Sequence, residues 1–505
     1  MTTIVAVNPM GGAFLRTGAK FSLALAVSIF VGCGPEPAAS PTPSPLPAAA
    51  PPPPPANSAS TTAARNEASP PPPERHQPGW GKDAPLANFP QAPKRDHEAE
   101  LAKAVAAGFK RIDSEHLTLV TDLPIDAEIE RLPKAFDLAF PQWCAYFGVD
   151  AAKNADWKII GYLVGDKDRF AQAGLLPADL PAFRHGYSRG QEFWLNEQPN
   201  PYYRRHLLLH EGTHSFMFTL LGSGGQNWYS EGMAELMATH HWDDQGLKLA
   251  YFPRSREDVP ELGRIKLVQD SLVVGNAMHV AQVLRFGPEA HQQNDGYAWC
   301  WALAAFLDSH PRYQARFRQL PALVNSLEFN EEFLRLFKDD LKILFEDWQV
   351  FVANLEHAYA VDRMIVDFTP GQPLPADGVE LKIPADQGWR NTGWKLEAGQ
   401  RYQVEASGRY QLGTEPVIWW SEPGGVSIRY YHAEPLGKLL AVVRPDGAPA
   451  DARSAFLKPL GIGLHGEIAP EVSGTLYLRI NDSAGELTDN VGEADVKVKE
   501  MRPGT

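Results

Sequence analysis

The residues best suited to chemistry form the pentapeptide His210-Glu-Gly-Thr-His214. On a helix, residues four apart lie one above the other, so His210 and His214 can both reach one metal ion. Glu211 would lie beside them, where its carboxylate can take a proton from water that the metal activates. The apolar run Leu207-Leu-Leu209 just upstream is typical of a buried helix. This pattern predicts a zinc site with Glu211 as the catalytic base.

A third ligand is expected in the helical segment Trp228-Tyr-Ser-Glu-Gly-Met-Ala-Glu235. Catalytic zinc sites take three protein ligands, and two His with one Glu is a common set. Glu231 would complete this set with His210 and His214, while Glu235, one turn on, would accept the free ring N–H of a ligating histidine. A solvated helix face is the alternative for two carboxylates at this spacing. The apolar neighbours predict burial instead, which is costly for carboxylates without partners.

These two motifs resemble the gluzincin metallopeptidases of the peptidase MA-like branch, over roughly residues 96–355. The resemblance implies a zincin-like fold and zinc-dependent hydrolysis of a peptide or protein substrate. In related aminopeptidases, a tyrosine near the start of a later helix stabilises the tetrahedral intermediate. The segment Gly296-Tyr-Ala-Trp-Cys-Trp-Ala-Leu-Ala-Ala-Phe-Leu307 resembles that helix. Tyr297 is therefore the candidate for this role, with an aromatic residue at the edge of the core as the alternative.

Hydrophobic periodicity indicates the elements that position these residues. Helices are expected at 97–112, 127–147, 203–221, 228–241, 297–307 and 329–355, and strands at 116–121, at 157–164 and in a hairpin at 186–195. After about Val361 the helical period ends, and short alternating segments follow. The sequence thus predicts a multidomain chain, with an α+β domain at 96–360 and an all-β sandwich at 376–500.

One loop of the expected sandwich collects oxygen-bearing side chains. Asp482, Glu486, Asp489 and Asn490 follow an alternating strand within a few residues. Carboxylate and amide oxygens suit Ca²⁺, a hard cation that takes six to eight oxygen ligands. A polar hairpin loop, in which Asp, Asn and Gly provide the turn geometry, is the alternative.

The stretch from about Asp377 to Val498 resembles the PA-I-type galactophilic lectin fold, a β-sandwich. The matching features are Gly388-Trp, Trp419-Trp-Ser-Glu-Pro-Gly-Gly425, Pro435-Leu-Gly437 and the segment from Asn481-Asp482 through Asp489-Asn490-Val-Gly492. In that lectin, calcium and galactose meet at this loop. The resemblance therefore implies Asp482, Asp489 and Asn490 as calcium ligands and a carbohydrate or glycoprotein as a partner.

The N-terminus suggests export. Residues 1–32 fit a signal peptide, because the apolar run Phe21–Val31 is too short for a bilayer core of roughly 30 Å but suits an h-region. Phe30-Val-Gly-Cys33 resembles the bacterial lipobox, and an ordinary signal peptide with an incidental cysteine is the alternative. Residues 33–95 are rich in Pro and Ala and are expected to be a disordered linker. We thus expect a lipoprotein, anchored at Cys33 and facing the periplasm or the cell exterior.

Composition narrows the choice of function. The 505-residue chain is 44% hydrophobic and 21% charged, with a formal net charge of -14. Nucleic-acid binding needs clustered Lys and Arg residues, and the sequence has no such cluster. Nucleic acid is therefore excluded as a partner. Three cysteines cannot make a disulfide framework, although Cys144 and Cys300 can either pair or stay free. The rival hypothesis is a catalytically inactive surface adhesin or lectin with the zincin domain as scaffold, but the intact motif at 210–214 together with Glu231 favours the enzyme.

Overall fold

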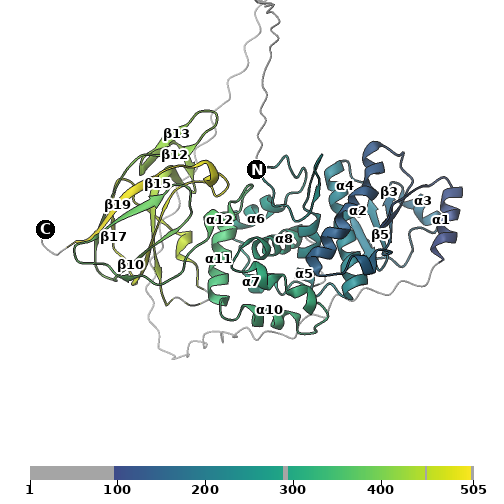
Figure 1. Ribbon diagram of the computed structural model, residues 1–505, viewed down its shortest axis with the longest axis horizontal. Coiled ribbons are helices and arrows are strands. Elements are labelled where there is room, and N and C mark those ends of the chain that lie inside the picture. The colour runs from purple at the N-terminus through teal and green to yellow at the C-terminus, as the bar shows by residue number, and fades with distance from the viewer. Residues whose placement is uncertain (1–95, 288–293, 448, 450–451, 502–505) are drawn as a thin grey trace, which may run out of the picture. The chain divides into compact units, whose positions relative to one another are not determined.

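The computed structural model describes residues 96–501 apart from 288–293, 448, 450 and 451. The expected signal peptide at 1–32, the anchor at Cys33 and the linker at 33–95 lie outside the described residues. The described residues belong to one compact unit. They form mixed helices and sheets, followed by a part built of strands (Figure 1).

A five-stranded sheet with the order β1-β2-β3-β5-β4 forms the N-terminal part. Its strands are β1 (Lys110–Asp113), β2 (Leu117–Thr121), β3 (Ile159–Val164), β4 (Gly186–Arg189) and β5 (Glu192–Asn196). β2, β3 and β5 run parallel, and the two edge strands, β1 and β4, are antiparallel to their neighbours. Phe193 and Leu195 of β5 face one core cluster, while Trp194 faces another, so both faces of the sheet are buried.

Helices cover both faces of this sheet. The helices are α1 (His97–Ala106) and α3 (Lys167–Gln172) on the face of Trp194, and α2 (Ala127–Phe147) and α4 (Pro201–Phe216) on the other. The expected helix at 97–112 is wrong in its second half. Gly108 has a φ of 86°, in the left-handed region that ends the helix, and β1 follows.

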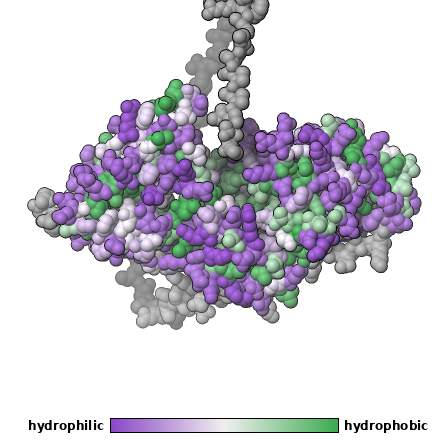
Figure 2. All heavy atoms as spheres, in the orientation of Figure 1, coloured by the Kyte–Doolittle hydropathy of each residue, from purple (hydrophilic) through white to green (hydrophobic). Residues whose placement is uncertain are grey.

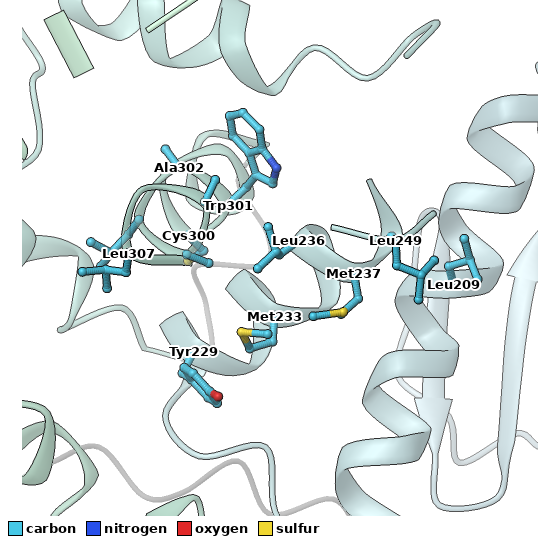
Figure 3. Packing of buried hydrophobic residues seen from close by; sticks show 14 of the residues in the cluster. Leu209, Tyr229, Met233, Leu236, Met237, Leu249, Cys300, Trp301, Ala302 and Leu307 are labelled. Atoms are coloured by element: carbon cyan, nitrogen blue, oxygen red, sulfur yellow. The ribbon is translucent and has the colours of Figure 1, made fainter. Parts of the chain in front are cut away.

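A second group of helices follows. These are α5 (Asn227–Ala238), α6 (Arg264–Val273), α7 (Val280–Val283), α8 (Asn294–Ser309), α9 (Gln314–Phe317), α10 (Phe329–Phe337), α11 (Leu341–Ala353) and α12 (Val361–Met364). A short 3₁₀ turn, η4 (Leu320–Leu323), and a hairpin of β6 (His241–Asp243) and β7 (Gly246–Lys248) belong to the same part, while the 3₁₀ turn η1 (Ala152–Asn154) lies between α2 and β3. The expected helix at 329–355 is thus two helices. In Figure 3, α5, which carries Leu236 and Met237, lies between α8, which carries Cys300, and α4, which carries Leu209.

The C-terminal part consists of two main sheets. One has the order β14-β15-β18-β10-β8 with β16 beside β15, and the other has the order β17-β11-β19-β9. The strands are β8 (Gln372–Pro373), β9 (Val379–Pro384), β10 (Arg390–Leu396), β11 (Tyr402–Ser407), β12 (Tyr410–Gly413), β13 (Trp419–Ser421), β14 (Gly424–Tyr431), β15 (Glu434–Pro445), β16 (Leu460–Gly461), β17 (His465–Ile468), β18 (Gly474–Ile480) and β19 (Glu493–Glu500), with 3₁₀ turns η5 (Ala455–Leu457) and η6 (Leu487–Asp489). β19 buries Ala494, Val496 and Val498 and exposes Asp495 and Lys497 between them, which gives the alternation expected of a sandwich strand.

The strands and the helices share apolar clusters. Ala484 and Leu487, from the loop after β18, belong to the cluster that contains the helices of the second group. Val350 of α11 packs in a cluster with Trp389 and Leu440 of the sandwich part. Among the described residues, we find no helix whose length and apolarity would suffice to cross a bilayer. Figure 2 shows a face that is mostly hydrophilic, with hydrophobic residues in small separate groups.

Candidate metal centre

Helix α4 holds both predicted histidine ligands in a buried position. The helix begins at Pro201, and Asn200 Oδ1 accepts the N–H of Tyr202 at 2.8 Å, which caps it. His210 and His214 are 5% and 4% exposed. Gly212 lies so close to α2 that a Cβ atom would meet the Phe136 ring at 2.6 Å. Glycine in the motif thus allows the close packing of the two helices.

Helix α5 brings Glu231 to the same place. The chain turns between α4 and α5 through Gly225, whose φ of 73° favours glycine. On α5, a Cβ at Gly232 would lie 2.9 Å from the Cys300 carbonyl oxygen, so α5 and α8 also pack closely. Glu231 therefore projects from a helix that is fixed on both sides, by α4 and by α8.

The three predicted ligand atoms form a small triangle. His210 Nε2 lies 3.2 Å from His214 Nε2, and Glu231 Oε2 lies 3.5 Å from each of them. Ligands about 2.0–2.1 Å from a tetrahedral zinc ion lie roughly 3.3–3.4 Å from one another. Within the described residues, the buried Glu231 Oε2 has no hydrogen-bond donor. The donor set and its spacing therefore fit a zinc ion.

Glu235 lies behind His210 at the distance of a hydrogen bond. Its Oε1 is 3.2 Å from His210 Nδ1, and its Oε2 is 3.3 Å from His206 Nε2. Arg264 donates to both oxygens, at 2.7 and 2.8 Å. Burial opposes ionisation, but Arg264 and then His206 hold the pKa of Glu235 well below its usual value. Glu235 thus orients His210 with its Nε2 toward the triangle.

His206, His210 and Glu235 also form a second group that could hold a metal ion. A cation there would compete with Arg264, whose guanidinium already contacts both carboxylate oxygens. It would also need His210 Nδ1 as a ligand, which is the nitrogen that carries the proton when Nε2 serves as the ligand in the triangle. The group of His210, His214 and Glu231 is therefore the better candidate.

Sequence reasoning missed two neighbours of the ligands. Ser230 Oγ lies 3.2 Å from His214 Nδ1, so it orients the second histidine as Glu235 orients the first. Ser230 directly precedes Glu231 in the sequence, and this position could have indicated a contact with the metal ligands. Arg264 lies 29 residues after its partner Glu235 and on another helix, so no local pattern indicates the contact.

Glu211, the predicted base, is buried beside the triangle and against β4. It is 6% exposed, and a Cβ at Gly186 would lie 2.4 Å from its Oε1. Burial raises the pKa of Glu211, the charges of His210 and His214 lower it, and Glu231 raises it again, with a net rise. A carboxylate with a raised pKa is suited to accept and then return a proton.

Tyr297 lies at the same centre. Its ring centroid is 5.9 Å from that of His210, and the Arg264 guanidinium lies 5.4 Å from the ring. Burial, and then the carboxylates of Glu231, Glu211 and Glu235, raise the pKa of Tyr297. Its hydroxyl therefore keeps its proton and can donate a hydrogen bond.

We predict that Gly186→Ala lowers hydrolysis while zinc content is unchanged. The new methyl group would displace the Glu211 carboxylate, and a misplacement of about 1 Å can cost about 100-fold in rate. The measurement is kcat/KM together with metal analysis. Gly447→Ala is the matched control, because a Cβ there meets no atom within 4 Å. If Gly186→Ala kept the parental activity, the position of the Glu211 carboxylate would not depend on its close contact with β4.

In the predicted calcium loop, the structure brings two of the three residues together. Asn490 Nδ2 donates to Asp482 Oδ2 at 2.8 Å, and Asn490 Oδ1 is buried without a donor in the described part of the chain. Burial raises the pKa of Asp482 to about 6. The Asp489 carboxylate instead accepts the N–H of Thr414 at 3.2 Å, and Glu486 forms an ion pair with Arg429.

Both described cysteines are free and buried. Cys144 lies on α2 and Cys300 on α8. The sequence left open whether these two residues form a disulfide, and in the structure they do not. Burial raises the pKa of the Cys300 thiol well above its usual value, which favours an inert thiol in the core.

No protein-family model matches the chain, and no curated protein matches it significantly. Among solved structures, the chain is similar to the EclA N-terminal domain, described as a PllA-like lectin, at 24% identity and a TM-score of 0.20, over 25% of this chain and 98% of that one. It is also similar to IMPa from Pseudomonas aeruginosa, solved in complex with an O-glycopeptide, at 14% identity and a TM-score of 0.14. That match covers 80% of this chain and 45% of IMPa. At these TM-scores neither likeness decides a function, so the proposals below rest on the residues of this chain.

Proposed function

We propose that the protein is a zinc-dependent peptidase of the gluzincin type. The observation that carries the proposal is the triangle of His210 Nε2, His214 Nε2 and Glu231 Oε2, with sides of 3.2, 3.5 and 3.5 Å, beside the buried Glu211. Zinc bound there would supply Lewis-acid polarisation of a carbonyl group and activation of a water molecule.

The residues around the triangle would divide the work of hydrolysis. Glu211 would accept the proton of the attacking water and pass it to the leaving amine. Tyr297 would donate a hydrogen bond to the oxyanion that develops on the scissile carbonyl. Glu235 and Ser230 would hold the rings of His210 and His214 in place.

Strand β4 offers a way to align the substrate. It is an edge strand of the five-stranded sheet, and its first residue, Gly186, contacts Glu211. An extended peptide can add to such an edge through main-chain hydrogen bonds. A peptide paired with β4 would pass beside the base, and this arrangement supports a peptide or protein as the substrate.

The test is cleavage of a peptide library by the purified protein. The library should contain unmodified peptides and glycosylated counterparts, because the sandwich is proposed below to bind carbohydrate. We expect hydrolysis that stops when a chelator removes zinc and returns when zinc is restored. A chain that binds zinc but cleaves nothing would favour the surface adhesin instead.

We propose further that the sandwich binds Ca²⁺ at the loop of Asp482 and Asn490, with Asp489 as a third ligand after a turn of its side chain, and that a carbohydrate or glycoprotein binds there. The buried, unpaired Asn490 Oδ1 and the buried carboxylate of Asp482 support a cation at this place. This proposal rests on the residues of the loop and on the resemblance to the galactophilic lectin.

We predict that calcium raises the melting temperature of the full chain and that Asp482→Asn abolishes the rise. A ligand that binds only the folded state stabilises it by RT ln(1 + [L]/Kd). The measurement compares zinc-loaded protein with and without millimolar calcium. Asp495→Asn, at an exposed carboxylate on β19, is the control and should keep the rise. Identical melting curves with and without calcium would refute the site.

Export and anchoring at Cys33 stay a proposal as well. The apolar run Phe21–Val31 and the lipobox-like sequence that ends at Cys33 support a lipoprotein signal. An extracytoplasmic position would place the proposed peptidase and carbohydrate sites where glycoproteins are accessible.

A further inference from the structure

Arg264 is the first residue of α6 and lies one layer behind the candidate metal centre. Its Nε donates to Glu235 Oε2 at 2.8 Å, and its Nη2 donates to Glu235 Oε1 at 2.7 Å. Its guanidinium carbon lies 5.4 Å from the centroid of the Tyr297 ring. The same group therefore contacts the partner of a zinc ligand and the tyrosine proposed to stabilise the oxyanion.

The stability of α6 itself does not explain an arginine at this place. A cation in the first turn of a helix is repelled by the helix dipole. Burial of the Arg264 side chain, which is 11% exposed, also costs free energy. The N-cap residue, Gly263, has no side chain that could compensate by capping the helix. The contacts with Glu235 and Tyr297 must therefore offset these costs.

The two carboxylate oxygens of Glu235 make matching sets of contacts. Oε1 lies close to Arg264 Nη2 and to His210 Nδ1, at 2.7 and 3.2 Å. Oε2 lies close to Arg264 Nε and to His206 Nε2, at 2.8 and 3.3 Å. Each carboxylate oxygen thus has one contact with the arginine and one with a histidine. Because a guanidinium fork binds both oxygens in one plane, Arg264 fixes the direction from which Glu235 meets His210.

We propose that Arg264 is a positioning residue, which acts through Glu235 on His210 and through its cation–π contact on Tyr297. It sets the rotation of the His210 ring, so that Nδ1 faces Glu235 Oε1 at 3.2 Å and Nε2 points into the triangle. It also keeps the Tyr297 ring beside His210. The inference rests on the proposed zinc site and adds to it a residue that couples the ligand and the tyrosine.

The test compares Arg264→Ala and Arg264→Lys with a matched control, Arg318→Ala. Arg318 forms the same kind of fork on Asp308, at 2.8 and 3.2 Å, and lies 5.2 Å from the Tyr146 ring. The measurements are the zinc Kd by competition with a chelator, kcat and KM of the zinc-saturated protein, and the absorption spectrum of the cobalt-substituted protein. Each is repeated with added guanidinium ion at concentrations that do not unfold the chain.

We expect the zinc Kd of Arg264→Ala to rise about 10–100-fold, as is typical for loss of a group behind a metal ligand. At saturating zinc, kcat should fall while KM changes little, and the cobalt spectrum should shift. Guanidinium ion should restore part of each effect, because it can occupy the space left by the side chain. Arg264→Lys should not restore them, since one ammonium group cannot bind both oxygens in a fork. Arg318→Ala should keep the parental values.

Parental zinc Kd, kcat and cobalt spectrum in Arg264→Ala would overturn the inference. So would losses that guanidinium ion does not reverse and that Arg318→Ala reproduces, because they would indicate general destabilisation. The proposed function fails separately. A parent chain that binds zinc but hydrolyses no peptide would refute the peptidase, while the zinc Kd and the cobalt spectrum still decide the role of Arg264.

Discussion

Glu211→Gln is expected to bind one zinc ion per chain and to lose hydrolysis by about 10²–10⁴-fold, the usual contribution of a general base. The amide has nearly the shape of the carboxylate, so the contact with Gly186 is preserved. It cannot accept a proton from water, however. Burial and the charge of Glu231 raise the pKa of the Glu211 carboxyl group, but an amide does not titrate, so they cannot make it a base.

The measurement is kcat/KM on a peptide that the parent cleaves, with the metal content of the same sample. Glu130→Gln, at an exposed position on α2, is the control for the chemical change alone. Turnover of Glu211→Gln close to the parental value would remove the proposed mechanism. Loss of zinc together with activity would mean that Glu211 helps to hold the ion.

His214→Ala and Glu231→Ala are expected to abolish stoichiometric zinc binding and, with it, hydrolysis. Each substitution removes one corner of the triangle of 3.2 and 3.5 Å and leaves two ligands, which hold zinc weakly. Glu235→Ala is the informative comparison. It should keep a bound ion with a raised Kd, because Glu235 contacts His210 Nδ1 rather than the triangle.

Equilibrium dialysis with metal analysis distinguishes these variants, and circular dichroism shows whether each is folded. If Glu231→Ala bound zinc like the parent while Glu235→Ala bound none, the ion would belong to the group of His206, His210 and Glu235. The assignment of Glu231 as third ligand would then be wrong.

The helices that carry the motifs could be predicted because their signals are local. The spacing of His210 and His214 and the apolar run before them lie within one helix, and α4 (Pro201–Phe216) forms over most of the expected range 203–221. The same holds for α2, whose expected bounds of 127–147 are confirmed. The expected helix at 97–112 failed in its second half because it extended a periodic pattern across Gly108, where the backbone needs a left-handed conformation.

The rest of the site depends on contacts between distant segments, and local patterns do not report these. Arg264 meets Glu235 only because α6 packs beside α8, which in turn packs against α5. Gly186 meets Glu211 because β4 is the edge strand beside α4. In the sandwich loop, the sequence places Asp489 next to Asn490, but the backbone turns its carboxylate toward Thr414. One sequence alone cannot specify these arrangements.

The central claim is that one zinc ion lies among His210, His214 and Glu231. The most direct test is X-ray diffraction from crystals of the full chain at wavelengths on either side of the zinc absorption edge. We predict a single strong anomalous peak within bonding distance of His210 Nε2, His214 Nε2 and Glu231 Oε2, which disappears below the edge. A map without a peak there, or with its peak between His206 and Glu235, would contradict the account.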